Sequence, residues 1–274
     1  MPELPEVEIV KRQLAKSLVN KKLKAAHTSG KAMRFTADTA LLSKLKDETV
    51  LSFNRRNKYI ILETDNLWIV FHLGMSGQLV VRQKFEANYK HEHFTLEFEG
   101  FSLALVDPRR FGGFAIYEKS KIPHYVDIPL FKSLGIEPFS KDYTLQALKI
   151  LLASRKQNIK QFLLDSANIC GIGNIYASEI LFRSKVSPFK KSQEIKPLKI
   201  KSLYNNILEV LSFAIEKGGS SISDFIHVNG QSGNMQNFYK VYARYNSPCF
   251  VCGNLIKKEK QFGRTTFFCS HCQK

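Results

Sequence analysis

Hydrophobic and polar residues recur along the chain with two different periods, and these periods divide it into segments. From residue 3 to residue 20, the apolar side chains Val7, Val10, Leu14 and Leu18 are spaced three or four positions apart. This spacing places them on one face of a helix. The segment begins with prolines and glutamates, which suit a first helical turn. We therefore expect the chain to open with an amphipathic helix.

After residue 23 the pattern changes to short runs of β-branched and aromatic residues, which continue to residue 118. The clearest runs cover residues 59–64, 67–73, 78–82, 93–98 and 101–106. Several short strands without helices between them are typical of a β-sandwich or barrel. Residues 119–143 contain three prolines and predict a connector.

A helical period returns between residues 144 and 217. It predicts helices over residues 145–152, 158–165, 175–182 and 203–217. A glycine-rich turn precedes the third of these helices, and a polar loop follows the last one, from Gly218 to Phe238. The order of a helix, a β-rich segment, a helical segment and a C-terminal tail predicts an α+β fold.

Composition adds a strong electrostatic signal. The 274 residues include 41 lysines and arginines against 24 acids, which gives a net charge of +17. A surplus of this size indicates a polyanionic partner such as nucleic acid, although basicity can also serve solubility alone. No run approaches the ~18 apolar residues of a membrane span, and the N-terminus is too acidic for a secretory signal. We expect a cytoplasmic protein with no membrane partner.

Four of the five cysteines form two pairs near the C-terminus: Cys249 with Cys252, and Cys269 with Cys272. Two thiolates at this spacing can reach one tetrahedral metal ion, and a hairpin would bring the second pair opposite the first. The pattern predicts one structural Zn²⁺, because four thiolates leave no coordination position open. Two disulfides are the alternative, which a reducing compartment disfavours. His271 could replace one cysteine, and Cys170 is expected only to pack.

The opening Met1-Pro2-Glu3-Leu4-Pro5-Glu6 carries candidate chemistry. Removal of Met1 would leave Pro2 with a free secondary amine beside two glutamates. An α-amine titrates near pH ~8, well below a lysine, so more of it is neutral and nucleophilic at physiological pH. Such an amine attacks carbonyl carbons or their equivalents and forms a Schiff base, which for a secondary amine is a cationic iminium. The alternative is that the prolines only begin the helix.

Two further turns carry weaker signals. Residues 171–174 (Gly-Ile-Gly-Asn) precede a helix and are similar to a phosphate-binding turn, or they form a plain turn capped by Asn174. In Asp107-Pro-Arg109-Arg110-Phe111, cations and an aromatic ring lie together on a turn. Such a set can enter a duplex and replace a displaced base, whereas core packing is the alternative for the ring.

These motifs occur in the order of one family. Residues 2–8, 55–59, 72–77, 107–112 and 171–179, with the cysteine hairpin, resemble the bacterial formamidopyrimidine-DNA glycosylases, also called 8-oxoguanine-DNA glycosylases/AP lyases. The resemblance implies a β-sandwich domain in residues 1–130, a helix–two-turns–helix domain in residues 131–234 and a zinc finger in residues 235–274. It also implies a monomer that binds double-stranded DNA containing oxidised bases or abasic sites.

The resemblance assigns catalytic roles. Pro2 would attack C1′ of the damaged nucleotide, expel the base and form the iminium. Glu3 would donate a proton beside it, and Glu6 would support the site. Lys58 would donate the proton for β-elimination and contact a phosphate, and Arg264 would serve δ-elimination.

DNA contacts are implied by the same resemblance. Phosphate contacts would come from His91, Arg110, Arg155, Lys160 and Asn174, with Lys156 a possible neighbour of Arg155. His93 is close enough to His91 to compete for that role. Met75, Arg109 and Phe111 would fill the gap left by the flipped nucleotide, and Arg109 would contact the orphaned cytosine.

The chain departs from the family pattern at several positions. Asn57 and Ala243 stand where the family has glycine, and Thr265 follows Arg264 where glycine is usual. The loop that would cover the flipped base contains no obvious reader of the lesion. Its candidates are Ser220, Ser221 and Ile222.

Two alternative functions remain. An endonuclease VIII-type glycosylase would use the same proline chemistry on oxidised pyrimidines, but its opening typically has glycine where Leu4 stands. A non-catalytic zinc protein that binds damaged DNA would keep the basic surface without needing Pro2 or Glu3. The intact opening favours the enzyme.

Overall fold

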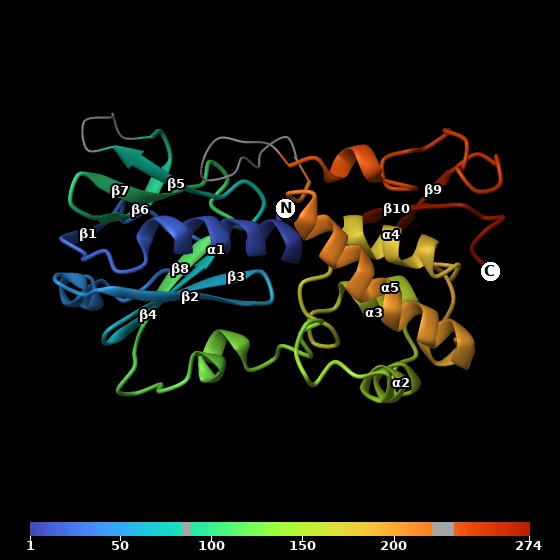
Figure 1. The fold of residues 1–274 in the computed structure, drawn as a ribbon, viewed down its shortest axis with the longest axis horizontal. Helices are drawn as coiled ribbons and strands as arrows, with labels where there is room; N and C mark the ends of the chain where they lie inside the picture. The colour runs from blue at the N-terminus through green and yellow to red at the C-terminus, as the bar shows by residue number, and fades with distance from the viewer. Residues whose placement is uncertain (84–88, 221–232) are drawn as a thin grey trace. The chain divides into compact units, whose positions relative to one another are not determined.

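The computed structural model describes residues 1–83, 89–220 and 233–274 (Figure 1). Its internal contacts divide the chain into two compact units. Unit 1 contains Met1–Lys132 and Gly218–Asn234, and unit 2 contains Ser133–Lys217 and Met235–Lys274.

Unit 1 combines one long helix with two antiparallel sheets, each with four strands in the described residues. The helix is α1 (Leu4–Leu18). The first sheet has the order β1 (Ala25–Thr28), β6 (Glu92–Glu97), β7 (Phe101–Val106) and β5 (Gln78–Gln83). The second has the order β2 (Val50–Arg56), β3 (Tyr59–Thr64), β4 (Leu67–His72) and β8 (Gly113–Glu118). The predicted helix and β-sandwich are confirmed.

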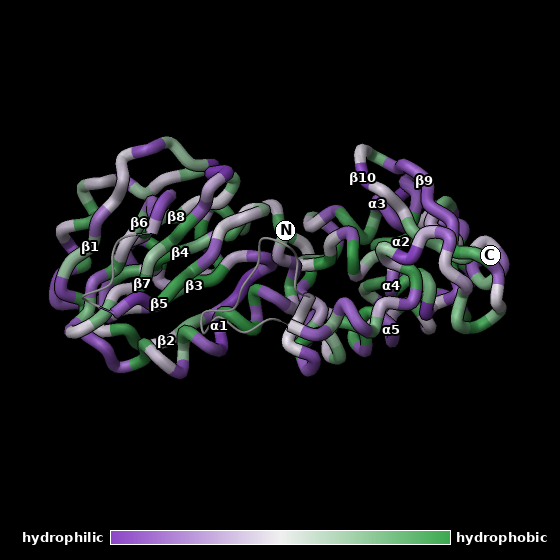
Figure 2. The backbone as a smooth tube through the Cα atoms, turned by 90° about the horizontal axis from the view of Figure 1, so that it is seen from above, coloured by the Kyte–Doolittle hydropathy of each residue, from purple (hydrophilic) through white to green (hydrophobic). Residues whose placement is uncertain are grey.

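The core of unit 1 lies between the two sheets. The ring of Phe94 on β6 stacks on that of Phe114 on β8, with centroids 4.1 Å apart, so side chains of the two sheets meet directly. The apolar face of α1, including Val7 and Leu14, belongs to the same core. Apolar segments run along β3 and β4 (Figure 2), which are buried almost throughout. Burial of this continuous apolar surface is the main source of stability.

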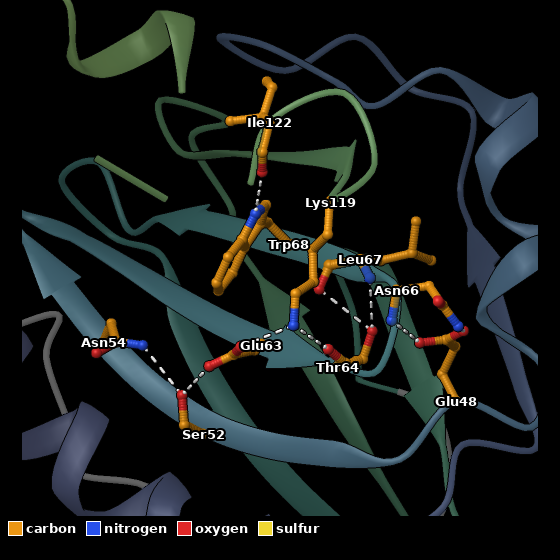
Figure 3. A network of polar contacts seen from close by, with 10 residues as sticks. All are labelled: Glu48, Ser52, Asn54, Glu63, Thr64, Asn66, Leu67, Trp68, Lys119 and Ile122. Atoms are coloured by element: carbon orange, nitrogen blue, oxygen red, sulfur yellow. Dashed lines mark hydrogen bonds and ion pairs between the residues drawn. The ribbon is translucent and has the colours of Figure 1, made fainter. Parts of the chain in front are cut away.

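Polar contacts on the second sheet fix how β2 and β3 pair (Figure 3). Glu63 on β3 accepts hydrogen bonds from Ser52 Oγ on β2 (2.7 Å) and from Lys119 Nζ beyond β8 (2.8 Å). Lys119 also donates to the Thr64 carbonyl (3.1 Å). A slip of one residue would turn every side chain of the hairpin to the opposite face. These contacts therefore also fix the turn that carries Lys58 at the other end of the hairpin.

Unit 2 contains the helices α2 (Leu145–Ala153), α3 (Ile159–Leu164), α4 (Asn174–Arg183) and α5 (Pro197–Glu216). Three of them match their predicted ranges closely. The predicted start of the fourth at residue 203 was wrong, because α5 begins six residues earlier with Pro197 in its first turn. None of the helices in the described residues is long and apolar enough to cross a membrane.

The C-terminal part of unit 2 is a hairpin of β9 (Lys257–Gln261) and β10 (Arg264–Phe268). Its two-residue turn holds Phe262 and Gly263, both with positive φ (50° and 73°). Two positive φ angles match the type I′ turn that the twist of a hairpin favours. Arg264 follows the turn directly, so it stands exposed at the tip of the hairpin.

Candidate functional site

The N-terminus is fixed by the first turn of α1. Glu3 is the N-cap residue, and its side chain accepts from the Glu6 N–H, while the Glu6 Oε2 accepts from the Glu3 N–H at 2.8 Å. This reciprocal capping box satisfies two backbone donors that a helix end leaves unpaired. Pro2, Glu3 and Glu6 are all buried. The local sequence thus sets where Pro2 lies relative to the two carboxylates.

Glu6 also reaches a distant part of unit 1. Its Oε1 accepts from the Ser220 N–H at 2.8 Å, across 214 positions of sequence. Gly219 adopts φ +70°, and a Cβ there would lie 3.0 Å from the same Oε1. One carboxylate therefore holds both Glu3 and the described beginning of the loop. The candidate readers Ser221 and Ile222 lie outside the described residues.

A cavity of about 590 Å³ opens beside the N-terminus. Its lining includes Met1 together with Met75, Arg109 and Phe111. These three side chains are exposed, and the Arg109 guanidinium lies 4.8 Å from the centre of the Phe111 ring. The structure thus brings together the three residues that the resemblance assigns to the gap in DNA.

Asp107 holds the two loops that carry these side chains. It is fully buried and accepts from the Ser76 hydroxyl at 2.6 Å, next to Met75. It also accepts from the backbone N–H groups of Arg109 (3.2 Å) and Gly112 (2.7 Å). A buried carboxylate with this many donors is strongly held in place. Asp107 therefore keeps the tips of both loops at one site.

The Lys58 turn is tied to α1 through an ion pair. Arg55 donates to the Asn57 carbonyl (2.8 Å) and to Glu8 Oε2 (3.1 Å) on the helix. Burial alone would raise the pKa of Glu8, but Lys11, Arg12 and Arg55 together hold it below its usual value. Glu8 therefore stays ionised at neutral pH and links the turn to helix α1, whose N-cap is Glu3.

Asn57 departs from the family glycine, and its geometry explains why glycine is usual. Its φ is +55°, a left-handed conformation that asparagine tolerates better than most residues. Ala243 stands at φ +58°, at a second position where the resemblance implies glycine. Alanine has no polar side chain to compensate for the strain there.

His72 lies within the motif of residues 72–77, but the sequence predicted no role for it. It is buried, and its Nδ1 accepts from the Gly74 N–H at 3.1 Å. Burial, Arg34 and Lys58 lower the pKa of His72 to about 4. The imidazole is therefore neutral at physiological pH and carries its proton on Nε2. Arg34 and Lys58 come close to His72 only in the folded protein, so the sequence could not indicate their effect.

The structure separates the two candidate histidines. His93 is buried, with Nδ1 3.1 Å from the Ser29 hydroxyl and Nε2 3.0 Å from the Asp107 carbonyl. His91 is exposed and adopts φ +68° at the turn before β6. Only His91 is accessible to a partner, whereas His93 contributes to the interior.

In unit 2, Asn174 and Lys160 both hold the zinc-finger hairpin. Asn174 is the first residue of α4, and its Nδ2 donates to the Thr265 carbonyl at 3.0 Å. Lys160 donates to the same carbonyl (3.2 Å) and to Thr266 Oγ1 (2.7 Å). The Lys160 side chain is fully buried, so its cation supports β10 from within. Both side chains anchor the residue that follows Arg264.

The other residues that the resemblance assigns to DNA contact differ in exposure. Asn174 Oδ1 is buried and has no hydrogen-bond partner within the described ranges. Arg155 is exposed and donates to Asn168 Oδ1 at 3.1 Å. Arg110, in unit 1, is likewise exposed.

Glu179 is a second residue that sequence reasoning missed. Its buried carboxylate accepts from three consecutive backbone N–H groups, those of Lys240 (2.9 Å), Val241 (3.0 Å) and Tyr242 (2.8 Å). Burial raises the pKa of Glu179 even though these hydrogen bonds lower it. Because Val241 belongs to the core of the finger, Glu179 attaches the finger to α4.

The four cysteines form the predicted metal site. Their Sγ atoms all lie within 4.8 Å of one another, including Cys249 to Cys272 at 4.0 Å and Cys252 to Cys269 at 3.5 Å. A tetrahedral zinc ion with bonds of about 2.3 Å requires sulfur atoms about 3.8 Å apart, so the cluster fits Zn²⁺. His271 is exposed and does not belong to the cluster. The zinc ion is structural, because four thiolates complete its coordination.

The class that this fold and these sites define is the zinc-finger DNA glycosylases. Residues 1–114 match the formamidopyrimidine-DNA glycosylase N-terminal domain, and residues 134–226 match the H2TH domain of the same enzymes. Residues 246–274 match the zinc finger found in FPG and IleRS. The chain belongs to the formamidopyrimidine-DNA glycosylase family.

Similar proteins cover the chain from end to end. A formamidopyrimidine-DNA glycosylase of Wolbachia pipientis is 37% identical over 275 residues, and one of Paraburkholderia phytofirmans is 38% identical over 277 residues. Both matches span all of this chain and all of the relative. A crystal structure of a Lactococcus lactis FPG mutant with DNA containing Fapy-dG has a TM-score of 0.92, 34% identity and full coverage of both chains. Another, of Lactococcus lactis Fpg with DNA containing an abasic site, has a TM-score of 0.90 and covers 99% of each chain.

Proposed function

We propose that this protein is a bifunctional DNA glycosylase and AP lyase of base-excision repair, which removes 8-oxoguanine and formamidopyrimidines from duplex DNA. The observation that carries the proposal is the N-terminus: Pro2 and Glu3 are held by a capping box beside a cavity lined by Met75, Arg109 and Phe111. The full-length similarity to named glycosylases supports the same reaction.

The chemistry begins with the Pro2 amine once Met1 is removed. Met1 lines the cavity, so we expect its removal to expose the Pro2 nitrogen there. The amine attacks C1′ of the damaged nucleotide, the bond from C1′ to the base breaks, and the proton lost by the amine goes to the departing base. The C1′–O4′ bond of the sugar then opens, and Glu3 supplies the proton that O4′ takes up. The product is a cationic iminium, which acts as an electron sink in the elimination steps that follow.

Elimination then cuts the strand. The iminium acidifies the C2′ proton, and its loss expels the 3′ phosphate by β-elimination. Lys58, buried at the β2–β3 turn, is the proton donor for this step, and Arg264 at the hairpin tip serves the δ-elimination that follows. Glu6 is a positioning residue, because it binds the backbone of both Glu3 and Ser220.

Duplex DNA is held mainly through its phosphates. The net charge of +17 favours a polyanion, and exposed His91, Arg110 and Arg155 offer donors. The free Oδ1 of Asn174 cannot donate, so Asn174 acts through the hairpin and the N-terminus of its helix. Buried Lys160 supports Arg264 by holding β10, which is an indirect contribution to binding.

Met75, Arg109 and Phe111 take the place of the flipped nucleotide. Their exposure and their shared cavity support this role, since a flipped base leaves an unstacked gap that side chains must fill. Arg109 contacts the orphaned cytosine. The protein acts as a monomer on chromosomal DNA, which implies a cytoplasmic location in association with the nucleoid.

The substrate is tested by comparing excision from two duplexes, one with 8-oxoguanine opposite cytosine and one with thymine glycol. We expect faster excision of 8-oxoguanine. A preference for thymine glycol would identify an endonuclease VIII-type enzyme instead. Neither excision nor strand cleavage by protein lacking Met1, with DNA binding intact, would favour the non-catalytic alternative.

A further inference from the structure

A second cavity lies within unit 2, beside the zinc knuckle. It has a volume of about 390 Å³. Its apolar wall is made by Phe182, Phe250 and Val251, and its rim carries the cations Arg183, Lys185 and Lys240. We call this site the knuckle cavity. None of the residues assigned above to catalysis or DNA contact lines it.

The knuckle cavity is remote from the proposed DNA contacts of unit 2. Helix α4 begins at Asn174, whose side chain contacts β10 next to Arg264. Phe182 lies eight residues further along the same helix. At a rise of 1.5 Å per residue, the two positions are about 12 Å apart along the axis. The cavity and the hairpin contact are therefore at opposite ends of α4.

The wall of the cavity is unusually apolar for a surface site. Phe250 and Val251 are 66% and 65% exposed, between two zinc ligands. The Val251 N–H donates to Cys249 Sγ at 3.4 Å, so the metal site fixes the shape of the knuckle. Exposed apolar groups held together in one place are typical of interaction sites. Their fixed conformation lowers the entropic cost of binding.

The rim is strongly cationic. The Arg244 guanidinium lies 3.6 Å from the centre of the Phe250 ring, and Lys240 Nζ lies 5.0 Å from it. Arg183 is 4.0 Å from Glu209, and Glu179 near it is committed to three backbone N–H groups. The positive charge at the rim is thus only weakly compensated, which favours an anionic partner.

We propose that the knuckle cavity binds a partner protein through an acidic segment that carries a bulky apolar side chain. The apolar side chain occupies the cavity against Phe182, Phe250 and Val251, and the carboxylates face the cationic rim. A nucleic acid fits less well, because Arg244 already covers a face of Phe250 on which a base would stack. Phosphates alone would also leave the apolar wall uncovered. The proposal does not depend on the glycosylase chemistry.

The test uses the full-length, zinc-loaded protein and a fluorescein-labelled peptide, Asp-Asp-Glu-Asp-Leu-Phe, followed by fluorescence anisotropy. We expect saturable binding that weakens as salt is raised. Replacing Leu-Phe of the peptide by Ala-Ala should weaken binding by about tenfold or more. Lys185→Glu in the protein should have a similar effect. Lys21→Glu, which changes an exposed residue of unit 1 by the same charge, should leave peptide binding unchanged.

Lesion excision and zinc content of the Lys185→Glu variant should equal those of the unchanged protein, which shows that its fold is intact. Phe250→Ser should also abolish peptide binding. If the Phe250→Ser protein loses zinc, the result with Lys185→Glu decides the test. Equal peptide binding by the Lys185→Glu and Lys21→Glu variants would overturn the proposal. It would also be overturned if the Ala-Ala peptide bound as well as the original. Loss of duplex binding by Lys185→Glu with no change in peptide binding would make the cavity a nucleic-acid site.

Discussion

The protonation states of individual side chains in this protein depend on neighbours that are distant in sequence. His72 is the clearest case, because burial, Arg34 and Lys58 lower its pKa to about 4. A neutral imidazole here can donate from Nε2 while Nδ1 accepts from the Gly74 N–H. The proton on the ring is thus fixed by the fold.

This lowered pKa has a consequence for stability. The unfolded chain binds a proton at His72 near its ordinary pKa of about 6.5, whereas the folded protein binds it only near pH 4. Stability from His72 is therefore present above pH ~6.5 and is lost as pH falls towards 4, by up to about 3 kcal/mol. Urea unfolding of the protein and of His72→Gln at several pH values should show this loss only when His72 is present. Parallel pH profiles for the two proteins would contradict the assignment.

Ala243 offers a second test at the same scale. Its φ of +58° strains an alanine, so Ala243→Gly should raise the free energy of unfolding by about 1 kcal/mol. Ala15 lies within α1, where the same substitution should lower stability by a similar amount. Thermal unfolding of both variants measures these changes. A destabilised Ala243→Gly protein would show that the strain is absent.

At the scale of elements, the sequence predicts the helices and strands that have a clear local pattern. It misses the elements or element ends that lack one. The helical period located α1, and short runs of β-branched and aromatic residues located β3 and β7, because each pattern is complete within its segment. β1 is only four residues long and has no buried side chain to mark it. The start of α5 was missed because its first turn is exposed and only Pro197 marks it.

The candidate site likewise contains residues that local motifs mark and contacts between distant residues that no motif marks. Pro2, Glu3 and the zinc cysteines are close in sequence to the partners that define them, so local motifs located them. The hydrogen bonds that Glu6 accepts from the Ser220 N–H and Glu179 accepts from the Lys240 N–H span 214 and 61 positions. No local pattern records such contacts. The sequence could therefore supply the candidate reacting groups and Glu6, but not the distant contacts that position them.

Glu179 provides the prediction at this scale. Glu179→Ala would leave three backbone N–H groups without their acceptor, at a cost of roughly 3 kcal/mol or more. The amides of residues 240–242 should then exchange with deuterium much faster, and zinc should be released more readily by a chelator. Glu179→Gln keeps one carbonyl oxygen as an acceptor and should be less affected. Unchanged exchange in Glu179→Ala would show that the carboxylate does not attach the finger.

At the scale of the whole molecule, the chain combines a capped N-terminal helix with a high net positive charge and a metal-stabilised hairpin. The net charge of +17 attracts DNA, and the capped helix presents Pro2 beside its carboxylates. The zinc ion fixes the fold of the finger, and Arg264 lies at its hairpin tip. These features agree with the full-length similarity to formamidopyrimidine-DNA glycosylases.

The charge predicts a strong salt dependence. Because phosphate contacts release counterions, the affinity for a lesion-bearing duplex should fall steeply as salt rises. Arg264→Ala should lower the steepness of this fall by about one contact, as measured by fluorescence anisotropy at several salt concentrations. A binding constant that is insensitive to salt would be inconsistent with phosphate contacts.

The reaction proposed above requires the Pro2 amine to form the covalent bond to DNA. Its most direct test is borohydride trapping of the protein on a duplex that contains 8-oxoguanine, followed by mass spectrometry of the cross-linked peptide. We expect a reduced adduct on the N-terminal Pro2 of protein lacking Met1, and far less adduct with Pro2→Gly despite intact DNA binding. An adduct on Lys58 or another lysine, or no adduct at all with protein lacking Met1, would contradict it.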